Sequence, residues 1–333
     1  MEAIFLCTSG RSHRTSKDSD LMKMGSQSYY VEVGFIKELT DACVEVSYQS
    51  GEKKKVKINE VPVKKIGNLM GHLNTVIFSP EDLFIIKEGP SERRRFIDIT
   101  ISQIKPSYFY DLQQYMKVLF QRNALLKEIQ YKRSLIDTLE IWNNNLIMIG
   151  SRIIKIRKEF INRLNGYIKI NHSKLTNGKE SLFLEYSPSI EIETYENIKE
   201  IEGAFRKALE KVKNKELIKA TTLLGPQRDD YEIILNDMNL KHYGSQGQQR
   251  TAVLSVKLSE IDIIKEETGE YPVILLDDVL SELDKSRQEY LLENLKGIQT
   301  FITCTENIFE NENSFLEKSF LNIKNGEIIK IHD

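Results

Sequence analysis

The chain has 333 residues, of which 40% are apolar and 29% charged, and its formal net charge is −2. This length allows a sizeable core in one large domain or two coupled lobes. The near-neutral charge excludes a uniformly cationic nucleic-acid binder, so any DNA contact needs a local basic patch. The sequence has no run of 18 apolar residues, which argues against a membrane span, and its three isolated cysteines argue against a disulfide framework or a zinc site.

Sequence patterns in the first third of the chain predict strands. Apolar and polar residues alternate over much of residues 29–66, which is typical of a half-exposed antiparallel meander. The segment Asn74–Phe78 predicts a short buried strand, and Ser79-Pro80 ends it.

The middle of the chain predicts helices. No proline occurs between Pro106 and Pro188, and apolar residues recur at helical spacing with charged residues between them. We expect two or three long amphipathic helices over about 92–166, a short strand at 183–187 and another helix over 201–220. These helices favour a plain helical lobe over a cofactor-binding bundle.

The last third returns to mixed strands and helices. Residues 231–243 predict a hairpin and 248–267 a helix. The apolar run before Asp277 predicts a strand of a parallel sheet that is covered on both faces. A helix with Asp284 as its N-cap and a strand over 299–305 follow.

The order of these elements predicts an α/β fold in two lobes. The chain ends in a hairpin that turns at Asn325-Gly326, a pair suited to a type I′ turn. Strands occupy both ends of the sequence and helices its middle. We therefore expect an α/β lobe built from residues 1–90 and 223–333, with a helical lobe of residues 91–222 inserted between them.

Two adjacent carboxylates, Asp277 and Asp278, follow the apolar run Val273–Leu276. Like charges so close repel, and burial disfavours their ionised form, so a bound cation would remove a cost. Mg²⁺ suits carboxylate ligands and usually keeps waters and phosphate oxygens as its others. We expect Asp277 to hold Mg²⁺ and Asp278 to face a γ-phosphate and orient or deprotonate the attacking water. Alone, the pattern also fits a strand that ends in a polar turn.

A second feature is the segment SQGQQ, which begins at Ser245. Ser245 and Gly247 stand at the start of a predicted helix, where backbone N–H groups and the helix dipole favour phosphate. Glycine lets another group approach the backbone closely. Alone, this segment could be a turn that caps a helix. The order of turn, helix, buried strand, paired carboxylates and SELD is more specific.

The two features together resemble the signature motif, Walker B motif and D-loop of ABC-type ATPases. More narrowly, five segments resemble the RecF family of recombination mediators: FSPEDL, GPSERRRFID, GPQRDD, SQGQQRT and LLDDVLSELD. The resemblance runs from the first residues to the last strand. It implies a two-lobed ABC-type ATPase head, ATP and Mg²⁺ as cofactors, and a weak DNA-dependent ATPase activity.

In that family a Walker A loop precedes a helix similar to MEAIF, the start of this chain. The 333 residues hold no GxxxxGK[ST] segment, because the Gly178-Lys179 pair is followed by Glu180. We expect an N-terminally truncated chain with Met1 inside the helix that follows the loop. The rival interpretation is a natural short form that has lost nucleotide binding. We expect the chain as written to bind ATP poorly and not to hydrolyse it alone.

The resemblance further implies an ATP-dependent homodimer with ATP between the Walker motifs of one subunit and the signature of the other. On that pattern Ser245, Gly247 and Gln248 would contact the γ-phosphate of the opposite subunit, and Asp284 would cross the interface. The cytoplasmic dimer would bind single-stranded or gapped DNA and work with RecO and RecR. It would help load recombinase and support replication restart and the SOS response.

Arginines supply the candidate DNA contacts. Arg11 and Arg14 lie in GRSHRT, where the first could instead reach the nucleotide, and Arg93 and Arg94 lie in ERRRF. Arginine forks suit phosphate oxygens. The segment Arg93–Arg95 could equally be a solvated or salt-bridged helix start.

Two further observations qualify the DNA and nucleotide interpretation. Lys53–Lys55 and Lys57 form a basic strip, which could be an ordinary solvated edge. Gln227 stands where the family's GPHRDD has a histidine, so an acid–base role there is doubtful, whereas Arg228 and Asp229 match.

Three functions are compatible with these patterns. The first is an ATP-dependent DNA-repair protein of the RecF type, and the second is a non-enzymatic DNA- or partner-binding scaffold. The third is the ATPase subunit of a membrane transporter. The SQGQQ signature, Asp278 in place of a glutamate and the lack of a histidine after FITCT argue against the third.

Overall fold

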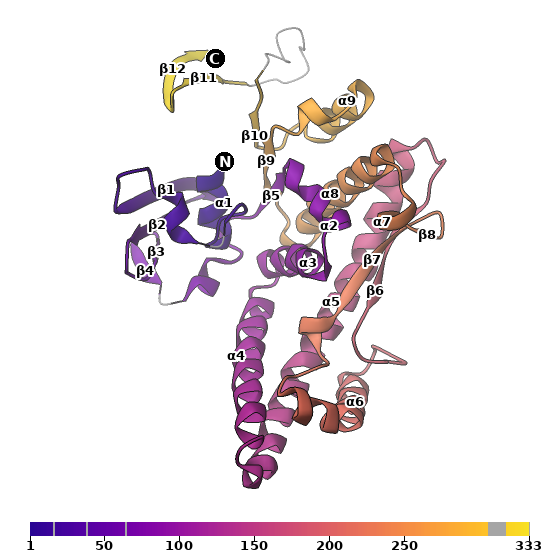
Figure 1. Cartoon of the computed structure of the whole chain (residues 1–333). Coiled ribbons are helices and arrows are strands. Elements are labelled where there is room, and N and C mark those ends of the chain that lie inside the picture. The colour runs from indigo at the N-terminus through magenta and orange to yellow at the C-terminus, as the bar shows by residue number, and fades with distance from the viewer. Residues whose placement is uncertain (16, 38, 64, 306–317, 333) are drawn as a thin grey trace.

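The computed structural model describes residues 1–15, 17–37, 39–63, 65–305 and 318–332. It has a strand-containing part near both termini and a long helical arm that extends away from it (Figure 1). The two-lobed α/β fold expected from the sequence is confirmed. Among the described residues, no helix has the length and apolar character needed to cross a membrane.

The predicted antiparallel meander is confirmed. Its four strands pair in chain order, namely β1 (Ser28–Lys37), β2 (Thr40–Gln49), β3 (Lys55–Ile58) and β4 (Val61–Val63). One face of this sheet packs against helix α1 (Glu2–Ser9), where Leu6 and Cys7 meet Val44 and Val46. The other face carries charged residues such as Glu32, Glu45 and Lys57, and Tyr30 and Ile36 are also exposed on it.

A parallel sheet joins the two ends of the chain. Strand β9 (Val273–Asp277) lies between β5 (Thr75–Phe78) and β10 (Thr300–Thr303). Ile274 and Leu276 belong to one apolar cluster and Leu275 to another, because successive side chains of a strand point to opposite faces. Burial on both faces explains why this strand is continuously apolar.

Two helices of the last third cover this sheet. Helix α8 (Gln246–Thr268) contributes Leu254, Leu258 and Ile261, and helix α9 (Lys285–Asn294) contributes Leu291, to the cluster that holds Ile274 and Leu276. Helix α8 has buried side chains on nearly all sides, so it is a core helix rather than a surface helix.

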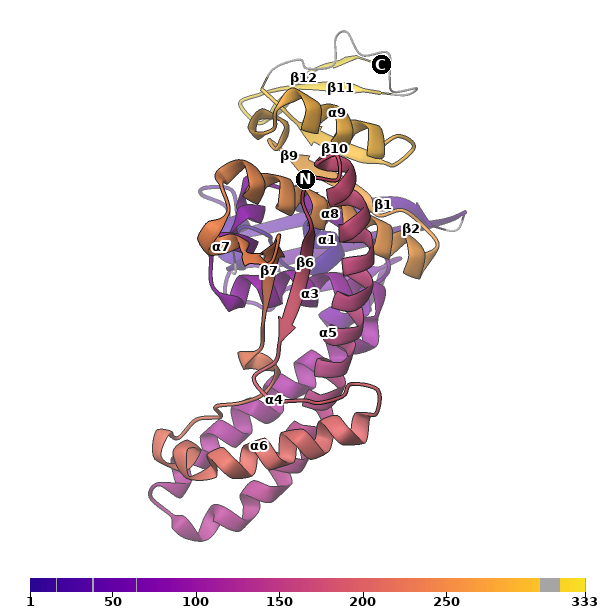
Figure 2. The ribbon, with the colours of Figure 1, turned by 90° about the vertical axis from the view of Figure 1, so that its right-hand side faces the viewer.

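Four helices build the arm and its junction with the sheets. They are α3 (Pro90–Ile104), α4 (Pro106–Ile129), α5 (Leu139–Leu175) and α6 (Ile198–Lys219). Figure 2 shows α6 lying across the distal half of the arm, away from the parallel sheet. A third sheet of β6 (Leu182–Ser187), β7 (Asp230–Leu235) and β8 (Met238–Asn239) runs beside α5. Strand β6 belongs to residues 91–222 and β7 to residues 223–333, so their pairing connects these two parts of the chain.

The hairpin predicted over 231–243 is only partly correct. After the turn that follows β7, the returning strand consists of Met238 and Asn239 alone, and residues Leu240–Tyr243 form the short helix α7. The Asn239 side chain accepts a hydrogen bond from the Lys241 N–H at 3.0 Å and so caps this helical turn.

The last hairpin is confirmed. Strands β11 (Phe320–Lys324) and β12 (Glu327–His332) pair antiparallel. Asn325 and Gly326 both have positive φ, 53° and 80°, as a type I′ turn requires.

Candidate functional site

The paired carboxylates lie at the carboxyl end of the central strand. Asp277 is the last residue of β9, and Thr303 Oγ1, at the end of the neighbouring β10, donates to its Oδ1 at 2.9 Å. The Asp278 N–H in turn donates to Thr303 Oγ1 at 3.1 Å. Asp278 has a φ of 54°, so the chain turns sharply there and leaves its side chain exposed. The edge of the sheet thus presents two carboxylates and one hydroxyl.

A cation already faces Asp277. Arg14 donates from Nη2 to Asp277 Oδ2, and the Arg14 side chain is 57% exposed. The loop that carries Arg14 is held in place by Arg95 of α3, whose Nη2 donates to the carbonyls of Ser12 and His13. The position opposite Asp277 therefore suits a positive charge, and a hard oxygen donor set of this kind fits Mg²⁺. Arg11 is exposed on the same loop.

The SQGQQ segment forms the start of α8. Ser245 is its N-cap: its Oγ accepts from the Gln248 N–H at 3.3 Å, while Gln248 Oε1 accepts from the Ser245 N–H at 2.9 Å. This is a capping box. Gln248 also donates to Glu180 at 2.8 Å. Ser245 and Gly247 are exposed, so the N-terminal end of α8 faces outward.

Gly247 has no explanation within the described chain. A Cβ at this position would meet nothing within 4 Å, and its φ is not positive. A glycine in the middle of a helix costs roughly 0.5–1 kcal/mol relative to alanine, and at Gly247, the second residue of α8, no contact of the described residues requires a glycine. The residue therefore suits a group from outside the chain that approaches the backbone closely.

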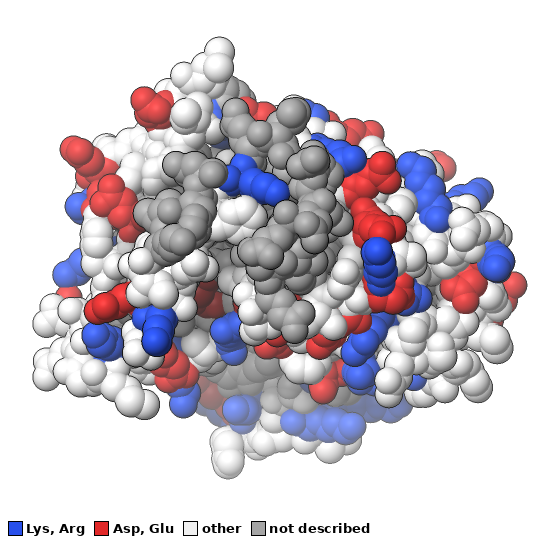
Figure 3. Space-filling view, turned by 90° about the horizontal axis from the view of Figure 1, so that it is seen from above, with Lys and Arg blue, Asp and Glu red and all other residues white. Residues whose placement is uncertain are grey.

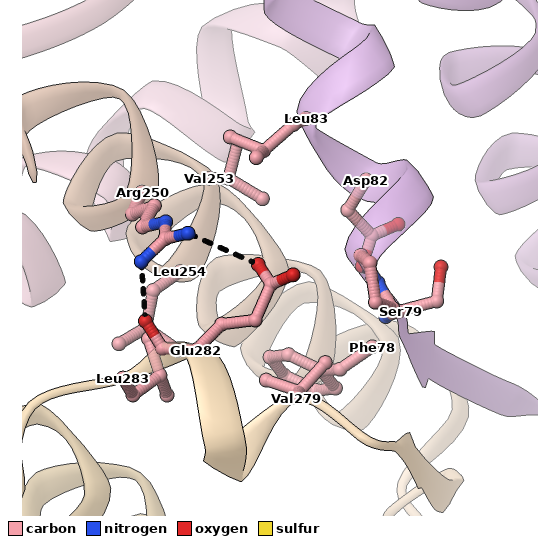
Figure 4. A pocket seen from close by; sticks show the side chains of 11 residues that line it. Phe78, Ser79, Asp82, Leu83, Arg250, Val253, Leu254, Val279, Glu282 and Leu283 are labelled. Atoms are coloured by element: carbon pink, nitrogen blue, oxygen red, sulfur yellow. Dashed lines mark hydrogen bonds and ion pairs between the residues drawn. The ribbon is translucent and has the colours of Figure 1, made fainter. Parts of the chain in front are cut away.

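Arg250 connects the start of α8 to the SELD segment that follows the paired carboxylates. The sequence reasoning missed this residue. Arg250 of α8 donates from Nη1 to the carbonyl of Glu282 at 2.8 Å, and its Nη2 lies 3.7 Å from the Glu282 carboxylate (Figure 4). Glu282 belongs to the SELD segment just after Asp278. The only signal in the sequence was that Arg250 follows the SQGQQ segment directly.

A small cavity of about 40 Å³ lies beside this contact. Its walls come from the FSPEDL segment, from α8 and from the SELD segment (Figure 4). Asp82 closes the FSPEDL turn, where its Oδ2 accepts from the Ser79 N–H at 2.8 Å. Three segments singled out from the sequence therefore meet at one place.

Asp284 is the N-cap of α9, as the sequence predicts. Its carboxylate accepts from the Arg287 N–H at 3.1 Å and from Ser286 Oγ at 2.7 Å. The hydrogen bond from Ser286, together with the neighbouring Arg287, lowers the pKa of Asp284. The side chain is 48% exposed and so remains accessible to a partner.

Arg93 is not a surface contact, which corrects the expectation of DNA binding there. Its guanidinium is buried and donates two hydrogen bonds to Asp230, at 2.7 and 2.8 Å. Arg94 donates to the carbonyl of Asp229 at 2.6 Å and is partly buried. Arg93 joins α3 to β7, whereas Arg11 and Arg14 remain exposed, although Arg14 also pairs with Asp277.

The GPQRDD segment is largely buried, with Gly225, Pro226 and Asp229 inside the protein and Arg228 exposed. Asp229 is fully buried and accepts a hydrogen bond from the Tyr186 hydroxyl, with Arg157 3.5 Å away. Burial raises the pKa of Asp229. Gln227 accepts from the Tyr115 hydroxyl, so glutamine serves here as a hydrogen-bonding partner and not as a titrating group.

The basic strip on the meander is largely neutralised. Lys54, Lys55 and Lys57 pair with Asp18, Glu52 and Glu45 respectively. Seen from above, the described surface carries both charge signs close together (Figure 3). The face seen from above therefore has no extended basic patch among the residues that the structure describes.

Comparison with known proteins identifies the family. The DNA replication and repair protein RecF of Acetivibrio thermocellus is 56% identical over 327 residues, which are 98% of this chain and 88% of the relative. The chain belongs to the RecF family. The RecF of Ruminiclostridium cellulolyticum is 50% identical over 329 residues, again 98% of this chain and 88% of the relative. No family model matches the sequence.

Solved RecF structures share the fold. A structure of the recombination mediator protein RecF-ATPrS in the RecFOR pathway superimposes with a TM-score of 0.89 at 39% identity, covering 98% of this chain and 86% of that chain. RecF-ATP gives 0.88 at 41% identity, covering 92% and 82%. The RecF resemblance stated from five short segments is thus confirmed over nearly the whole chain.

Proposed function

We propose that this chain is a recombination mediator of the RecFOR pathway, which acts in the cytoplasm during DNA replication and repair. The likeness to RecF-ATP and RecF-ATPrS over most of the chain carries this proposal. In it, the dimer binds single-stranded or gapped DNA, works with RecR and RecO, and helps load recombinase. Replication restart and the SOS response depend on that step.

The 333 residues contain no GxxxxGK[ST] segment, so the proposal assigns to them two parts of a composite nucleotide site. Asp277 would hold Mg²⁺ with bound nucleotide, and Asp278 would orient or deprotonate the attacking water. A metal ion bound at Asp277 Oδ2 would compete with Arg14, which donates to the same oxygen, whereas Oδ1 accepts from Thr303.

The start of α8 supplies the second part. Ser245, Gly247 and Gln248 present a helix N-terminus to the γ-phosphate held by another subunit, where the helix dipole favours an anion. The empty space around Gly247 supports this assignment. Asp284 lies in the SELD segment, which crosses to the partner in the same dimer.

A single experiment separates this proposal from the alternative of a non-enzymatic scaffold. Sedimentation velocity and DNA-binding anisotropy are measured on the chain and on a Ser245→Ala variant, without ATP and with ATP and Mg²⁺ raised over a wide concentration range, because the chain holds no GxxxxGK[ST] segment and weak binding is expected. Dimerisation and DNA binding that rise with ATP and fall in the variant support the mediator. DNA binding that ignores ATP supports the scaffold, and no DNA binding at all contradicts both.

A further inference from the structure

A row of four lysines runs along α6 on the helical arm. Lys207, Lys211, Lys215 and Lys219 follow one another at intervals of four residues, and all four are exposed. Residues four apart lie on one face of a helix, about 6 Å apart along its axis. The row, here called the α6 ridge, is therefore about 18 Å long.

The α6 ridge is not neutralised within the described part of the chain. No described carboxylate forms an ion pair with any of the four lysines, in contrast to the lysines of the meander. Lys211 and Lys215 have no acidic residue three or four positions away on either side. Glu216, which is nearby in sequence, is buried and bound to Arg122.

Helix stability alone does not account for this arrangement. Like charges four residues apart destabilise a helix, by roughly 0.2–0.5 kcal/mol per pair. Cations near the helix C-terminus interact favourably with the dipole, which explains Lys219 and in part Lys215. That effect does not reach Lys207 and Lys211, which lie two to three turns earlier.

The arm tip extends the same basic surface. Gln130, just after α4, donates to the carbonyls of Leu217 and Ile218, so the end of α4 lies against the end of α6. Lys132 and Arg133 follow it and are exposed. Tyr131, between them and Gln130, is 91% exposed. Figure 2 places this end of the arm far from the parallel sheet.

We propose that the α6 ridge and the arm tip bind the phosphate backbone of a nucleic acid strand. Regularly spaced, unpaired lysines on a straight helix match a linear polyanion, and an exposed tyrosine beside them can stack on a base. The surface is separate from the Arg11 and Arg14 candidates on the loop after α1. This inference rests on the proposed DNA-binding function and adds a second contact region to it.

The test compares two variants of the whole chain. One replaces all four ridge lysines by glutamine (Lys207→Gln, Lys211→Gln, Lys215→Gln and Lys219→Gln), and the matched control replaces the same four by arginine. Anisotropy with fluorescein-labelled single-stranded and gapped DNA is recorded from 50 to 300 mM salt. Circular dichroism checks that both variants retain the helix content of the parent chain.

The glutamine variant should bind DNA at least tenfold more weakly. The slope of log K against log[salt] should become shallower by about 3, because each lost phosphate contact removes roughly 0.7–0.9. The arginine variant should bind as the parent does.

If the parent binds DNA and the glutamine variant keeps its affinity and slope, the inference is overturned while the proposed function stands. If that variant instead loses only binding of labelled polyglutamate, the ridge serves an acidic protein and the inference is also overturned. A parent chain that binds no DNA contradicts the proposed function itself.

Discussion

Arg14 donates a hydrogen bond to Asp277, so the loop after α1 places a guanidinium against the carboxylate at the end of the central strand. The two residues come from opposite ends of the sequence. Their contact joins the α1 loop to the parallel sheet, and it marks the position where a cation is favoured. The strength of this contact can be measured separately from any nucleotide chemistry.

Arg14→Gln should lower the free energy of unfolding by less than about 1 kcal/mol, because an exposed ion pair loses most of its Coulomb energy to solvent. Urea unfolding at neutral pH, at low and at high salt, is the measurement. A loss above about 2 kcal/mol would show that the pair is a main support of the loop, and would weaken the argument that a metal ion competes with Arg14 for Asp277.

Glu216→Gln should cost far more, about 3–5 kcal/mol, because it leaves Arg122 buried with an uncompensated charge. Arg122 Nη2 donates to Glu216 Oε2 at 2.6 Å, and both side chains are at most 2% exposed. Glu210→Gln on the same helix is the matched control. Its side chain is exposed, so its effect should stay within about 0.5 kcal/mol. Similar losses in the two variants would contradict the conclusion that Glu216 neutralises the buried charge of Arg122.

Gly247→Ala should separate stability from assembly. A Cβ at Gly247 meets open space within the chain, so alanine should raise the free energy of unfolding by about 0.5–1 kcal/mol. The same methyl group would obstruct a phosphate at the start of α8, so ATP-dependent dimerisation should weaken. Gly203→Ala in α6 also adds a Cβ in open space and is the control. Equal ATP-dependent dimerisation in both variants would show that no phosphate approaches the backbone closely at Gly247.

The free energy of unfolding should depend on pH through Asp82 in the FSPEDL turn. Burial raises the pKa of Asp82 from 3.8 to about 6. A carboxyl group with a raised pKa in the folded state favours folding when protonated, so its contribution is full below about pH 4 and is lost as pH rises through 6. Relative to the parent chain, Asp82→Asn should therefore gain stability between pH 4 and 6.5.

Chemical denaturation of both chains at pH 4, 5, 6 and 7 measures this difference. A difference that stays constant over the whole range would mean that Asp82 titrates normally. Asp82→Asn keeps an oxygen that can accept from the Ser79 N–H, so the turn itself should persist. Glu81→Gln, in the same turn but exposed, is the control.

Sequence patterns predicted the local elements well, because the periodicity of apolar residues and the capping residues act within one segment. The meander, the buried strand β9, the Asp284 cap and the Asn325-Gly326 turn were all confirmed. The hairpin over 231–243 was wrong at its end, because the side chain of Asn239 caps a helical turn in place of continuing the strand.

The amino-acid sequence by itself determined the α/β class, the two ends of the candidate site and the family, since these depend on short segments with specific order. Only the tertiary structure decided which charges are available. Arg93 and Asp230 lie far apart in the sequence yet neutralise each other, and Lys54 and Lys57 of the meander meet the carboxylates of Asp18 and Glu45, which also lie outside their own segment. The lysines of α6 meet none among the described residues. An ion pair forms only where the fold brings two side chains together, and no pattern within one segment contains that information.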